Sequence, residues 1–262
     1  MSFRRMRHVK AREFQGCDIA YDFSNPASLY DATAGGSLVA ADGAIARAED
    51  LSGNAGHMLQ TTSGYRPLRK VAALNGMDVA RFDGSNDYLD AGDVGDMLDK
   101  PVEAYVLLKR TGGNVIQGFF GKSRYGNTGG RWAIYREIND AGFITVASGF
   151  SPASSATVLS PQLLALVSQR KTGASAGVTR LRRNAGQTVA SGSSYTDPLD
   201  SLDTTDVTLL GAYQNNTGTT PPKANTYFTG DMGECAKYSV AFSDAQRQRR
   251  DCGLARKWRI AT

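Results

Sequence analysis

Glu137 and Asp140 are the two acidic residues whose spacing comes nearest to the pair that cleaves glycosidic bonds. Cleavage needs two carboxyl groups on the same side of the site: one protonates the leaving oxygen while the other attacks the sugar. Residues three apart point to opposite faces of a strand. The sequence therefore disfavours a glycan hydrolase.

Other catalytic patterns are missing from the sequence. The only histidines are His8 and His57, and no Gly-x-Ser-x-Gly turn is present to carry a nucleophilic serine. The sequence has no Walker loop, no dinucleotide fingerprint and no zinc-ligand spacing among its cysteines. We interpret His57 as a residue that flanks the turn at residues 52–54. The sequence thus predicts a protein that is not an enzyme and has no cofactor or bound metal.

Five aspartates that follow one another closely are the candidates for calcium binding. Aspartate and carbonyl oxygens are calcium ligands, but the spacing here does not match an EF-hand loop. Aspartates in turns also accept hydrogen bonds from their own backbone. We favour this second interpretation and keep calcium as the alternative. The residues are Asp83, Asp87, Asp90, Asp93 and Asp96.

Aromatic and amide side chains in loops are the candidates for sugar binding, because a ring can stack on a pyranose while amides bond its hydroxyls. The predicted glycan-binding residues are Tyr125, Tyr213, Asn215 and Asn216. We expect Trp132, Tyr135 and Tyr195 to lie in the core or on a sheet face instead.

Positive charge is concentrated at the N-terminus. Residues 1–12 hold five basic residues and no acid, so that the rest of the chain is balanced, with 25 residues of each sign. An arm this polar buries too little apolar surface to order itself, and we expect it to be anchored on an acidic partner; a solvated tail is the alternative. An arm without interleaved aromatic residues, on a neutral body, argues against nucleic acid. The anchoring residues are Arg4, Arg5, Arg7, Lys10 and Arg12.

A second basic region has no acidic residue between positions 141 and 196. Arg180 and Arg182 share one face of a strand there. That face could meet an acidic polysaccharide or an acidic neighbouring subunit. The alternative is a solvated sheet face.

Length, hydropathy and cysteine number set the class of protein. The 262 residues show no linker, and we predict a basic arm at 1–15 and one domain at 16–262. No run of 18 apolar residues exists to span a membrane, and no apolar segment follows the charged N-terminus as in a secretory signal. Three cysteines argue against a disulfide framework and favour buried thiols, with a Cys235–Cys252 bridge as the alternative.

The pattern of short apolar runs separated by turn-forming residues predicts an all-β sandwich. Its 29 glycines, together with Ser, Thr, Asn and Asp, separate short apolar runs. We expect strands near residues 102–108, 131–135, 142–147, 163–167 and 205–211. Residues 243–258 predict one helix, which begins with a Ser243–Gln246 capping box. Its packing face would contain Cys252, Leu254 and Trp258.

Residues 75–89 predict a strand, a tight turn and a second strand. Val79, Arg81 and Asp83 should face one side and Ala80 and Phe82 the other, before a turn at residues 84–86. This segment resembles a signature of the concanavalin A-like lectin/glucanase superfamily, in particular the laminin-G-like jelly rolls of phage and bacterial surface proteins. Residues 49–57, 180–187 and 228–258 resemble further motifs of that family in the same order. In the last segment the matching residues are Glu234, Tyr238, Phe242, Ser243, Asp244, Arg247, Lys257 and Trp258.

The resemblance implies a jelly-roll sandwich of two antiparallel sheets with a short C-terminal helix. Glycanases of the superfamily carry an E-x-D-x-x-E motif, whereas here Asn139 replaces the middle acid and the third acid is missing. We therefore expect a non-enzymatic bacteriophage virion protein, such as a head decoration, spike, fibre or tail adaptor. It would be made in a host cytoplasm, attach to other virion proteins of the capsid or tail through its arm, and face host surface polysaccharide. We also expect it to form a homo-oligomer. The alternatives are a free soluble lectin and, less favoured, a glycan hydrolase.

Overall fold

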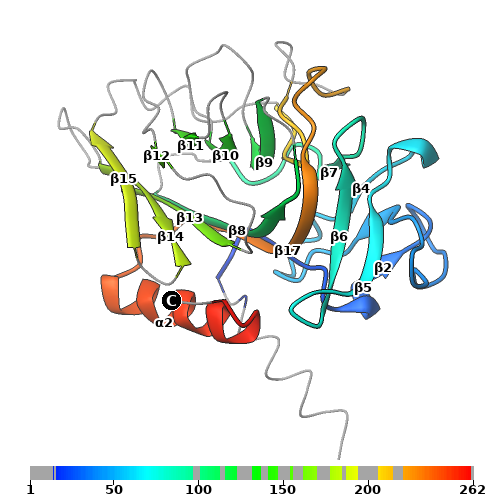
Figure 1. Cartoon of the computed structure of the whole chain (residues 1–262), viewed down its shortest axis with the longest axis horizontal. Helices are drawn as coiled ribbons and strands as arrows, with labels where there is room; N and C mark the ends of the chain where they lie inside the picture. Colours follow the sequence, from blue (N-terminus) through cyan, green and yellow to red (C-terminus); the bar gives the residue numbers. More distant parts are fainter. Residues whose placement is uncertain are drawn as a thin grey trace, which may run out of the picture.

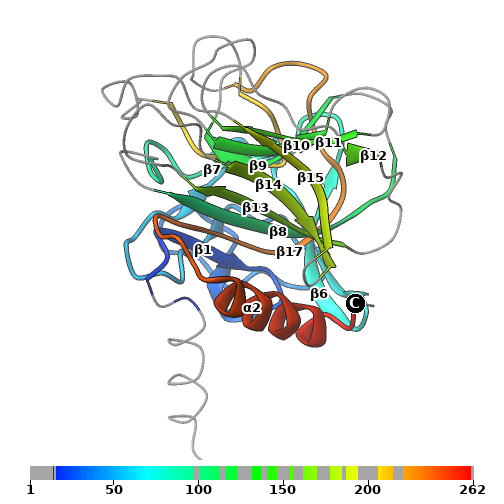
Figure 2. The same cartoon turned by 90° about the vertical axis from the view of Figure 1, so that its left-hand side faces the viewer.

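Two antiparallel sheets and one helix make up the described part of the chain (Figure 1). The computed structural model describes residues 14, 16–96, 101–112, 116–122, 132–136, 141–146, 154–155, 162–169, 178–184, 187–193, 206–214 and 221–260. The sheets lie face to face, and the helix α2 (Asp244–Lys257) lies outside the sandwich (Figure 2). The predicted all-β sandwich with a C-terminal helix is confirmed.

The first sheet, called sheet A, has eight strands in the order β15-β14-β13-β8-β17-β6-β5, and β1 pairs separately with β17. Its strands are β1 (Ile19–Asp22), β5 (Leu68–Leu74), β6 (Met77–Asp83), β8 (Val102–Arg110), β13 (Gln162–Gln169), β14 (Val178–Arg183), β15 (Gln187–Ser193) and β17 (Thr229–Tyr238).

The second sheet, called sheet B, has nine strands in the order β12-β11-β10-β9-β16-β7-β4-β3-β2. Several of these strands are only two residues long, and two 3-10 helices, η1 (Pro26–Ser28) and η2 (Ser63–Tyr65), lie among them. The strands are β2 (Leu29–Tyr30), β3 (Arg47–Ala48), β4 (Met58–Leu59), β7 (Leu89–Asp90), β9 (Gln117–Lys122), β10 (Trp132–Arg136), β11 (Ala141–Val146), β12 (Ser154–Ser155) and β16 (Leu209–Leu210).

The predicted strand–turn–strand at residues 75–89 connects the two sheets. Ala80 and Phe82 of β6 lie in the main core, whereas Val79 packs on the opposite face, as alternation requires. Gly84 has a φ of +81°, and a Cβ at this position would lie 1.9 Å from the Thr229 hydroxyl. The turn therefore needs glycine both for its backbone conformation and for its close approach to β17.

Strand β8 is buried on both faces, which explains its nearly continuous apolar sequence. Val106 and Leu108 point into the core between the sheets, and Tyr105 and Leu107 point into a second core beneath α2. A strand covered on both sides loses the polar–apolar alternation of a half-exposed strand. The remaining predicted strands also agree with β10, β11 and β13.

The strand predicted at residues 205–211 is shorter than expected, since β16 covers only Leu209–Leu210. The Thr208 amide donates to the Gly92 carbonyl and its hydroxyl donates to the Val94 carbonyl at 2.6 Å. Gly211 has a φ of +85°, outside the strand region. Before β16, hydrogen bonds to the 91–96 loop therefore replace regular strand pairing. After β16, the backbone turn at Gly211 ends the strand.

Helix α2 begins with the predicted capping box, in which the Gln246 amide donates to the Ser243 hydroxyl while the Gln246 side chain accepts from the Ser243 amide. Leu254 and Trp258 are buried against sheet A as predicted, whereas Cys252 is only partly buried. A Cβ on Gly233 of β17 would lie 2.3 Å from the Trp258 ring. The indole therefore packs where β17 has no side chain.

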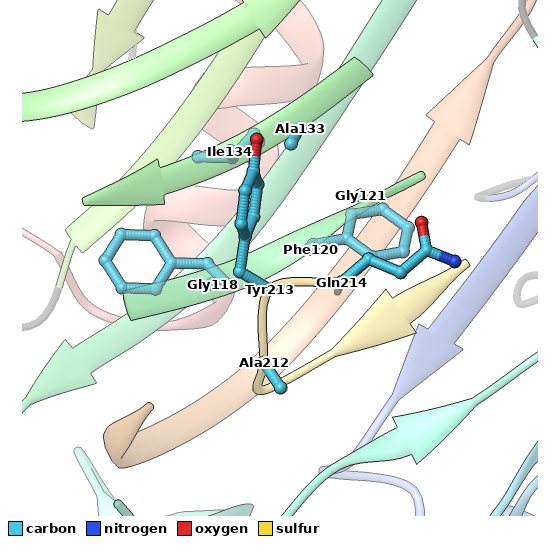
Figure 3. A pocket seen from close by; sticks show the side chains of 9 residues that line it. Gly118, Phe120, Gly121, Ala133, Ile134, Ala212, Tyr213 and Gln214 are labelled. Carbon is cyan, nitrogen blue, oxygen red and sulfur yellow. The ribbon is translucent and has the colours of Figure 1, made fainter. Parts of the chain in front are cut away.

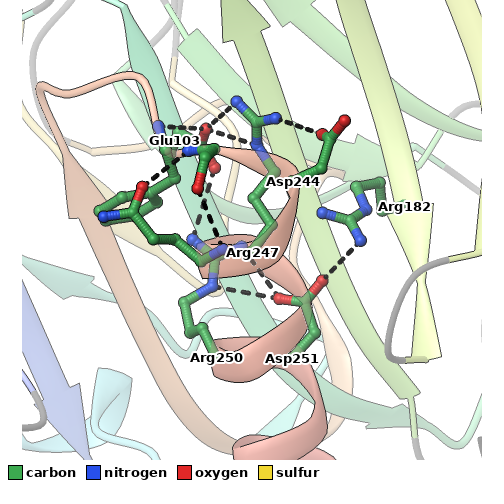
Figure 4. A network of polar contacts seen from close by, with 9 residues as sticks. Glu103, Arg182, Asp244, Arg247, Arg250 and Asp251 are labelled. Carbon is green, nitrogen blue, oxygen red and sulfur yellow. Dashed lines mark hydrogen bonds and ion pairs between the residues drawn. The ribbon is translucent and has the colours of Figure 1, made fainter.

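A buried ion network also joins α2 to sheet A (Figure 4). The Glu103 carboxylate of β8 is fully buried and accepts hydrogen bonds from Arg247 Nε at 2.7 Å and from the Phe242 amide at 3.1 Å. Asp251 pairs with Arg250 at 3.0 Å and with Arg182 of β14 at 3.3 Å. The acidic partner of Arg182 thus belongs to the chain's own helix, which corrects the expectation of a solvated or glycan-facing position for this residue.

All three cysteines are free thiols, and Cys17 and Cys235 are buried. The alternative of a Cys235–Cys252 bridge is therefore wrong.

No helix in the described ranges is long and apolar enough to cross a membrane.

Candidate functional site

An open cleft of about 370 Å³ lies on the outer face of sheet B, beside β4 and β7. Figure 1 shows where these two strands lie in the fold. We call the opening the β4–β7 cleft. Its lining combines an imidazole, a carboxylate, a phenol, an amide and a hydroxyl with a small apolar surface. The lining residues are His57, Leu59, Gln60, Thr61, Tyr88, Asp90, Ala91 and Gly92.

Strand register brings these residues together. Leu59 of β4 lies opposite Asp90 of β7 in an antiparallel pair. Met58 and Leu89 point into the main core, so their neighbours along each strand point outward. Extending the register places Thr61 opposite Tyr88 and His57 opposite Gly92. The cleft is therefore a set of cross-strand neighbours on the solvent side of the sheet.

The side of the cleft formed by Ala91 and Gly92 belongs to a loop that is held by buried side chains of the neighbouring strands. The Trp132 indole donates to the Gly95 carbonyl at 2.8 Å, and the buried Lys122 ammonium pairs with Asp96 at 2.7 Å and also with Asp93. Buried lysines are retained where they are paired. These contacts hold the loop in one position beside β7.

The opposite side is fixed by Gln60 and Arg66. Gln60 Nε2 donates to the Tyr88 carbonyl at 3.0 Å, and its Oε1 accepts from the Thr62 amide at 3.0 Å. Arg66 donates to the carbonyls of Gln60 and Thr61 at 3.0 and 3.3 Å. Both the strand pairing and the turn after β4 are thus pinned, which makes the cleft a preformed one.

His57 enters the cleft as a hydrogen-bond donor. Its Nδ1 accepts a hydrogen bond from the Asp50 amide at 3.0 Å, so the neutral ring carries its proton on Nε2. The Asp50 carboxylate in turn accepts from the amides of Ala20 and Gly56 at 2.9 and 3.1 Å. The turn before β4 therefore sets both the tautomer and the orientation of the imidazole.

Asp90 supplies an acceptor. One carboxylate oxygen accepts from the Gly92 amide at 2.7 Å. Burial raises the pKa of Asp90, and the Gly92 hydrogen bond opposes that rise. Gly92 itself has a φ of +71°, and a Cβ there would meet no atom within 4 Å. A side chain at this position would therefore project into open space rather than against a neighbouring residue.

Three tyrosines form an aromatic surface next to the cleft. Tyr88 packs against Leu209 and Ala212 together with the partly exposed Tyr65 and Tyr227. The Tyr65 and Tyr88 ring centroids are 6.2 Å apart. Burial raises the pKa values of Tyr88 and Tyr227, which keeps both phenols neutral and able to donate a hydrogen bond.

The predicted glycan residue Tyr213 lies elsewhere on sheet B. It is 7% exposed, and its ring centroid is 4.9 Å from that of Tyr135. Figure 3 shows Tyr213 over β9 and β10, in a pocket that leaves no room for a water molecule. A sugar could stack on Tyr213 only after the ring becomes exposed, and its role stays a prediction. Tyr125, Asn215 and Asn216 lie outside the described residues.

The aspartate series mostly bonds its own backbone, as we favoured. Asp83 accepts from the Ser85 amide at 2.7 Å, Asp87 accepts from the Asp83 amide at 3.0 Å, and Asp90 accepts from Gly92. Asp93 and Asp96 pair with Lys122. Within the part of the chain that the structure describes, no three His, Cys, Asp or Glu side chains gather as metal ligands; calcium stays a prediction.

Further predicted residues fall outside the described ranges. These are Glu137 and Asp140, and the arm residues Arg4, Arg5, Arg7, Lys10 and Arg12.

No family model matches the sequence, and no curated protein sequence matches it. Among solved structures, a GH54 α-L-arabinofuranosidase soaked with a cyclic sulfate inhibitor has a TM-score of 0.61 at 16% identity, over 91% of this chain and 62% of that chain. An arabinofuranosidase complexed with arabinofuranosyl-α-1,2-xylobiose gives a TM-score of 0.62 with the same identity and coverage. The chain thus spans less than two thirds of these proteins, and the likeness shows the β-sandwich fold alone.

The CBM40 of Ruminococcus gnavus IT-sialidase, bound to α2,6-sialyllactose, aligns at 14% identity over 59% of this chain and 85% of that chain. Its TM-score is 0.46.

Sequence reasoning missed the β4–β7 cleft, although a signal was present. Residues 57–61 alternate between polar or exposed positions and buried ones, with His57, Leu59 and Thr61 on one face. In residues 88–90, Leu89 points into the core between Tyr88 and Asp90, which line the cleft. The sequence does not show that these two segments pair, because they lie about thirty residues apart.

Proposed function

We propose that this protein is a non-enzymatic β-sandwich that binds a glycan in the β4–β7 cleft. The observation that carries the proposal is the set of outward groups on two paired strands. Thr61 and His57 Nε2–H can donate hydrogen bonds, Asp90 can accept them, and Tyr65 and Tyr227 offer rings at the border. Aromatic surface with a few fixed polar groups is what a sugar requires.

The fold supports the proposal by analogy. The arabinofuranosidase of similar fold was complexed with arabinofuranosyl-α-1,2-xylobiose, and we carry over from it only the class of ligand, a sugar. Fold alone does not specify function, and the argument therefore rests on the residues of the cleft.

The carboxylate count favours binding over hydrolysis. Glycosidases place two carboxyl groups about 5 to 9.5 Å apart across the sugar. Among the described residues that line the cleft, Asp90 supplies one carboxylate. Asp50, near His57, is held by backbone amides and by Ser52. A hydrolase needs a second acid that this lining does not provide.

A glycan array probed with the whole chain tests the proposal. We expect binding that falls at least tenfold in Asp90→Ala and is unchanged in Asp42→Ala, whose exposed carboxylate pairs with Lys70 away from the cleft. Loss of binding in both variants, or in neither, would place the sugar site elsewhere. Incubation with arabinofuranosyl-α-1,2-xylobiose should release no arabinose; release that Asp90→Ala abolishes would replace binding by hydrolysis.

We further propose that the protein forms part of a bacteriophage virion surface as a homo-oligomer, where its arm anchors it to other virion proteins. The support is the family resemblance of the sequence and the concentration of five basic residues in residues 1–12. Deletion of residues 1–12 should abolish attachment to the particle while sugar binding persists. If the truncated chain still joins the particle, the anchoring role fails and a free lectin becomes the better description.

A further inference from the structure

The charge of the β4–β7 cleft points to the class of sugar that it takes. We propose, resting on the glycan-binding function above, that the cleft accepts neutral and amino sugars and excludes sugars that carry a carboxylate. The inference depends on three features: an acid in the lining, a histidine that enters as a neutral donor, and cations that are committed to other partners.

Asp90 is the one acidic side chain among the described residues that line the cleft. One of its oxygens accepts the Gly92 amide. In the ranges that the structure describes, no hydrogen bond or ion pair occupies the other oxygen. We expect the group to be ionised at neutral pH, because it stays partly exposed and keeps the Gly92 hydrogen bond. A ligand therefore meets a negative charge with a free acceptor oxygen.

The neighbouring cations do not offset this charge. Lys122 is fully buried and pairs with Asp93 and Asp96. Arg66 donates to the carbonyls of Asp31, Gln60 and Thr61 and is not part of the lining. Neither side chain can turn to a ligand carboxylate without breaking these contacts.

His57 does not supply a positive charge in its observed arrangement. Protonation at Nδ1 would require the loss of the hydrogen bond from the Asp50 amide, which donates to that nitrogen at 3.0 Å. The ring therefore offers one N–H to a hydroxyl rather than an ion pair to an acid. Arg47 of β3 lies opposite Leu59, but it donates to the Thr33 carbonyl at 3.2 Å and pairs with Glu49 at 3.7 Å. A sugar carboxylate near Asp90 would thus meet cations that already have partners.

The size of the effect follows from Coulomb's law. Two like charges about 5 Å apart, at the effective dielectric constant of about 20 found near protein surfaces, repel strongly enough to lower affinity more than tenfold. A sugar with an ammonium group at the same place should bind about threefold to tenfold more tightly than the neutral sugar. This gain is smaller than the loss for a carboxylate, because partial exposure and salt weaken the attraction of an ion pair.

Six hexoses test the proposal on the whole chain at pH 7.5. Glucose, glucosamine and glucuronate share one ring configuration, and galactose, galactosamine and galacturonate share another. Protein-observed NMR titration should show the amine binding tightest, the neutral sugar next, and the acid at least tenfold weaker within whichever set binds. Asp90→Asn should abolish these differences, since it keeps the acceptor for the Gly92 amide and removes the charge.

Asp42→Asn is the matched control, because it makes the same acid-to-amide change at an exposed aspartate that pairs with Lys70 and lies outside the cleft lining. It should leave the preference unchanged. Uronates that bind as tightly as the neutral sugars would overturn the charge selection while leaving glycan binding intact. If none of the six hexoses perturbs the cleft, glycan binding itself fails there, and the charge selection fails with it.

Discussion

The outer face of sheet A is covered by other parts of the chain, whereas the outer face of sheet B is open at β4 and β7. On sheet A, α2 and the segment around Cys17 cover the surface, and the Trp258 ring and the Glu103 carboxylate are fully buried beneath them. On sheet B, the outer face at β4 and β7 stays open and presents His57, Thr61 and Asp90. The same sandwich thus uses one face for stability and leaves part of the other face open, where we propose that a ligand binds.

Hydrogen bonding distinguishes the two faces as clearly as burial does. Glu103 accepts from Arg247 and the Phe242 amide, and Glu234 accepts from the Tyr105 hydroxyl at 2.8 Å and the Trp258 indole at 3.2 Å. Polar groups under the helix are thus bonded within the chain, as burial demands. Around the cleft, Asp90 and His57 each use one atom for the fold and keep another for solvent or a ligand.

The largest expected effect is on the covered face. Trp258→Ala removes a fully buried indole that packs against Gly233 of β17, and should lower the free energy of unfolding by about 4 kcal/mol. Urea denaturation followed by far-UV circular dichroism measures it. Leu38→Ala, at an exposed position, is the control and should change little. A loss for Trp258→Ala no greater than that of the control would mean that α2 does not stabilise sheet A.

Glu103→Gln should have the next largest effect. The substitution keeps the size of the side chain but leaves the buried Arg247 with the exposed Asp244 as its one anionic partner among the described residues. Removing one partner of a buried ion pair costs about 3 kcal/mol. Equilibrium unfolding at pH 7 tests this, and Asp244→Asn, at the exposed end of the same network, should cost far less. Equal losses would show that burial does not govern the pair.

A smaller effect concerns Asp87, in the connection between β6 of sheet A and β7 of sheet B. Burial raises its pKa from 3.8 to about 6. The folded state therefore holds the proton more tightly than the unfolded state, so this contribution to stability is complete below about pH 4 and is lost as pH rises through 6. Its size should be about 2 kcal/mol.

Asp87→Asn should flatten the corresponding part of the pH–stability curve, as measured by denaturation at pH 4, 5, 6 and 7. The amide oxygen can still accept from the Asp83 amide. Asp31→Asn, at an exposed position that does not contribute to the raised pKa of Asp87, provides the comparison. An unchanged slope in Asp87→Asn would assign the pH dependence to other groups.

The smallest effect is expected on the open face, where Asp90→Asn makes the same acid-to-amide change as Glu103→Gln. The free energy of unfolding should change by less than about 0.5 kcal/mol, since the carboxylate has no ion-pair partner among the described residues and the amide can still accept from Gly92. The two variants are to be unfolded side by side. A loss for Asp90→Asn as large as that for Glu103→Gln would remove the distinction between the faces.

Much of the fold was predictable because it depends on local pattern. Alternation at residues 79–83 assigned the two faces of β6 correctly, and Ser243 and Gln246 marked the start of α2. The candidate site was less accessible, since loop composition pointed to Tyr213, whose ring is buried against Tyr135. Composition does not reveal which residues a neighbouring strand will cover.

Neighbours along the chain account for the strand periodicity, the capped helix and the separation of five basic residues at the N-terminus from a charge-balanced remainder. These features could therefore be predicted from the sequence. The tertiary structure alone decided that Glu103 meets Arg247, that Arg182 meets Asp251, and that Leu59 lies opposite Asp90. Each of these contacts joins segments far apart in sequence. Their partners are selected by sheet order and register, which depend on the packing of the whole sandwich.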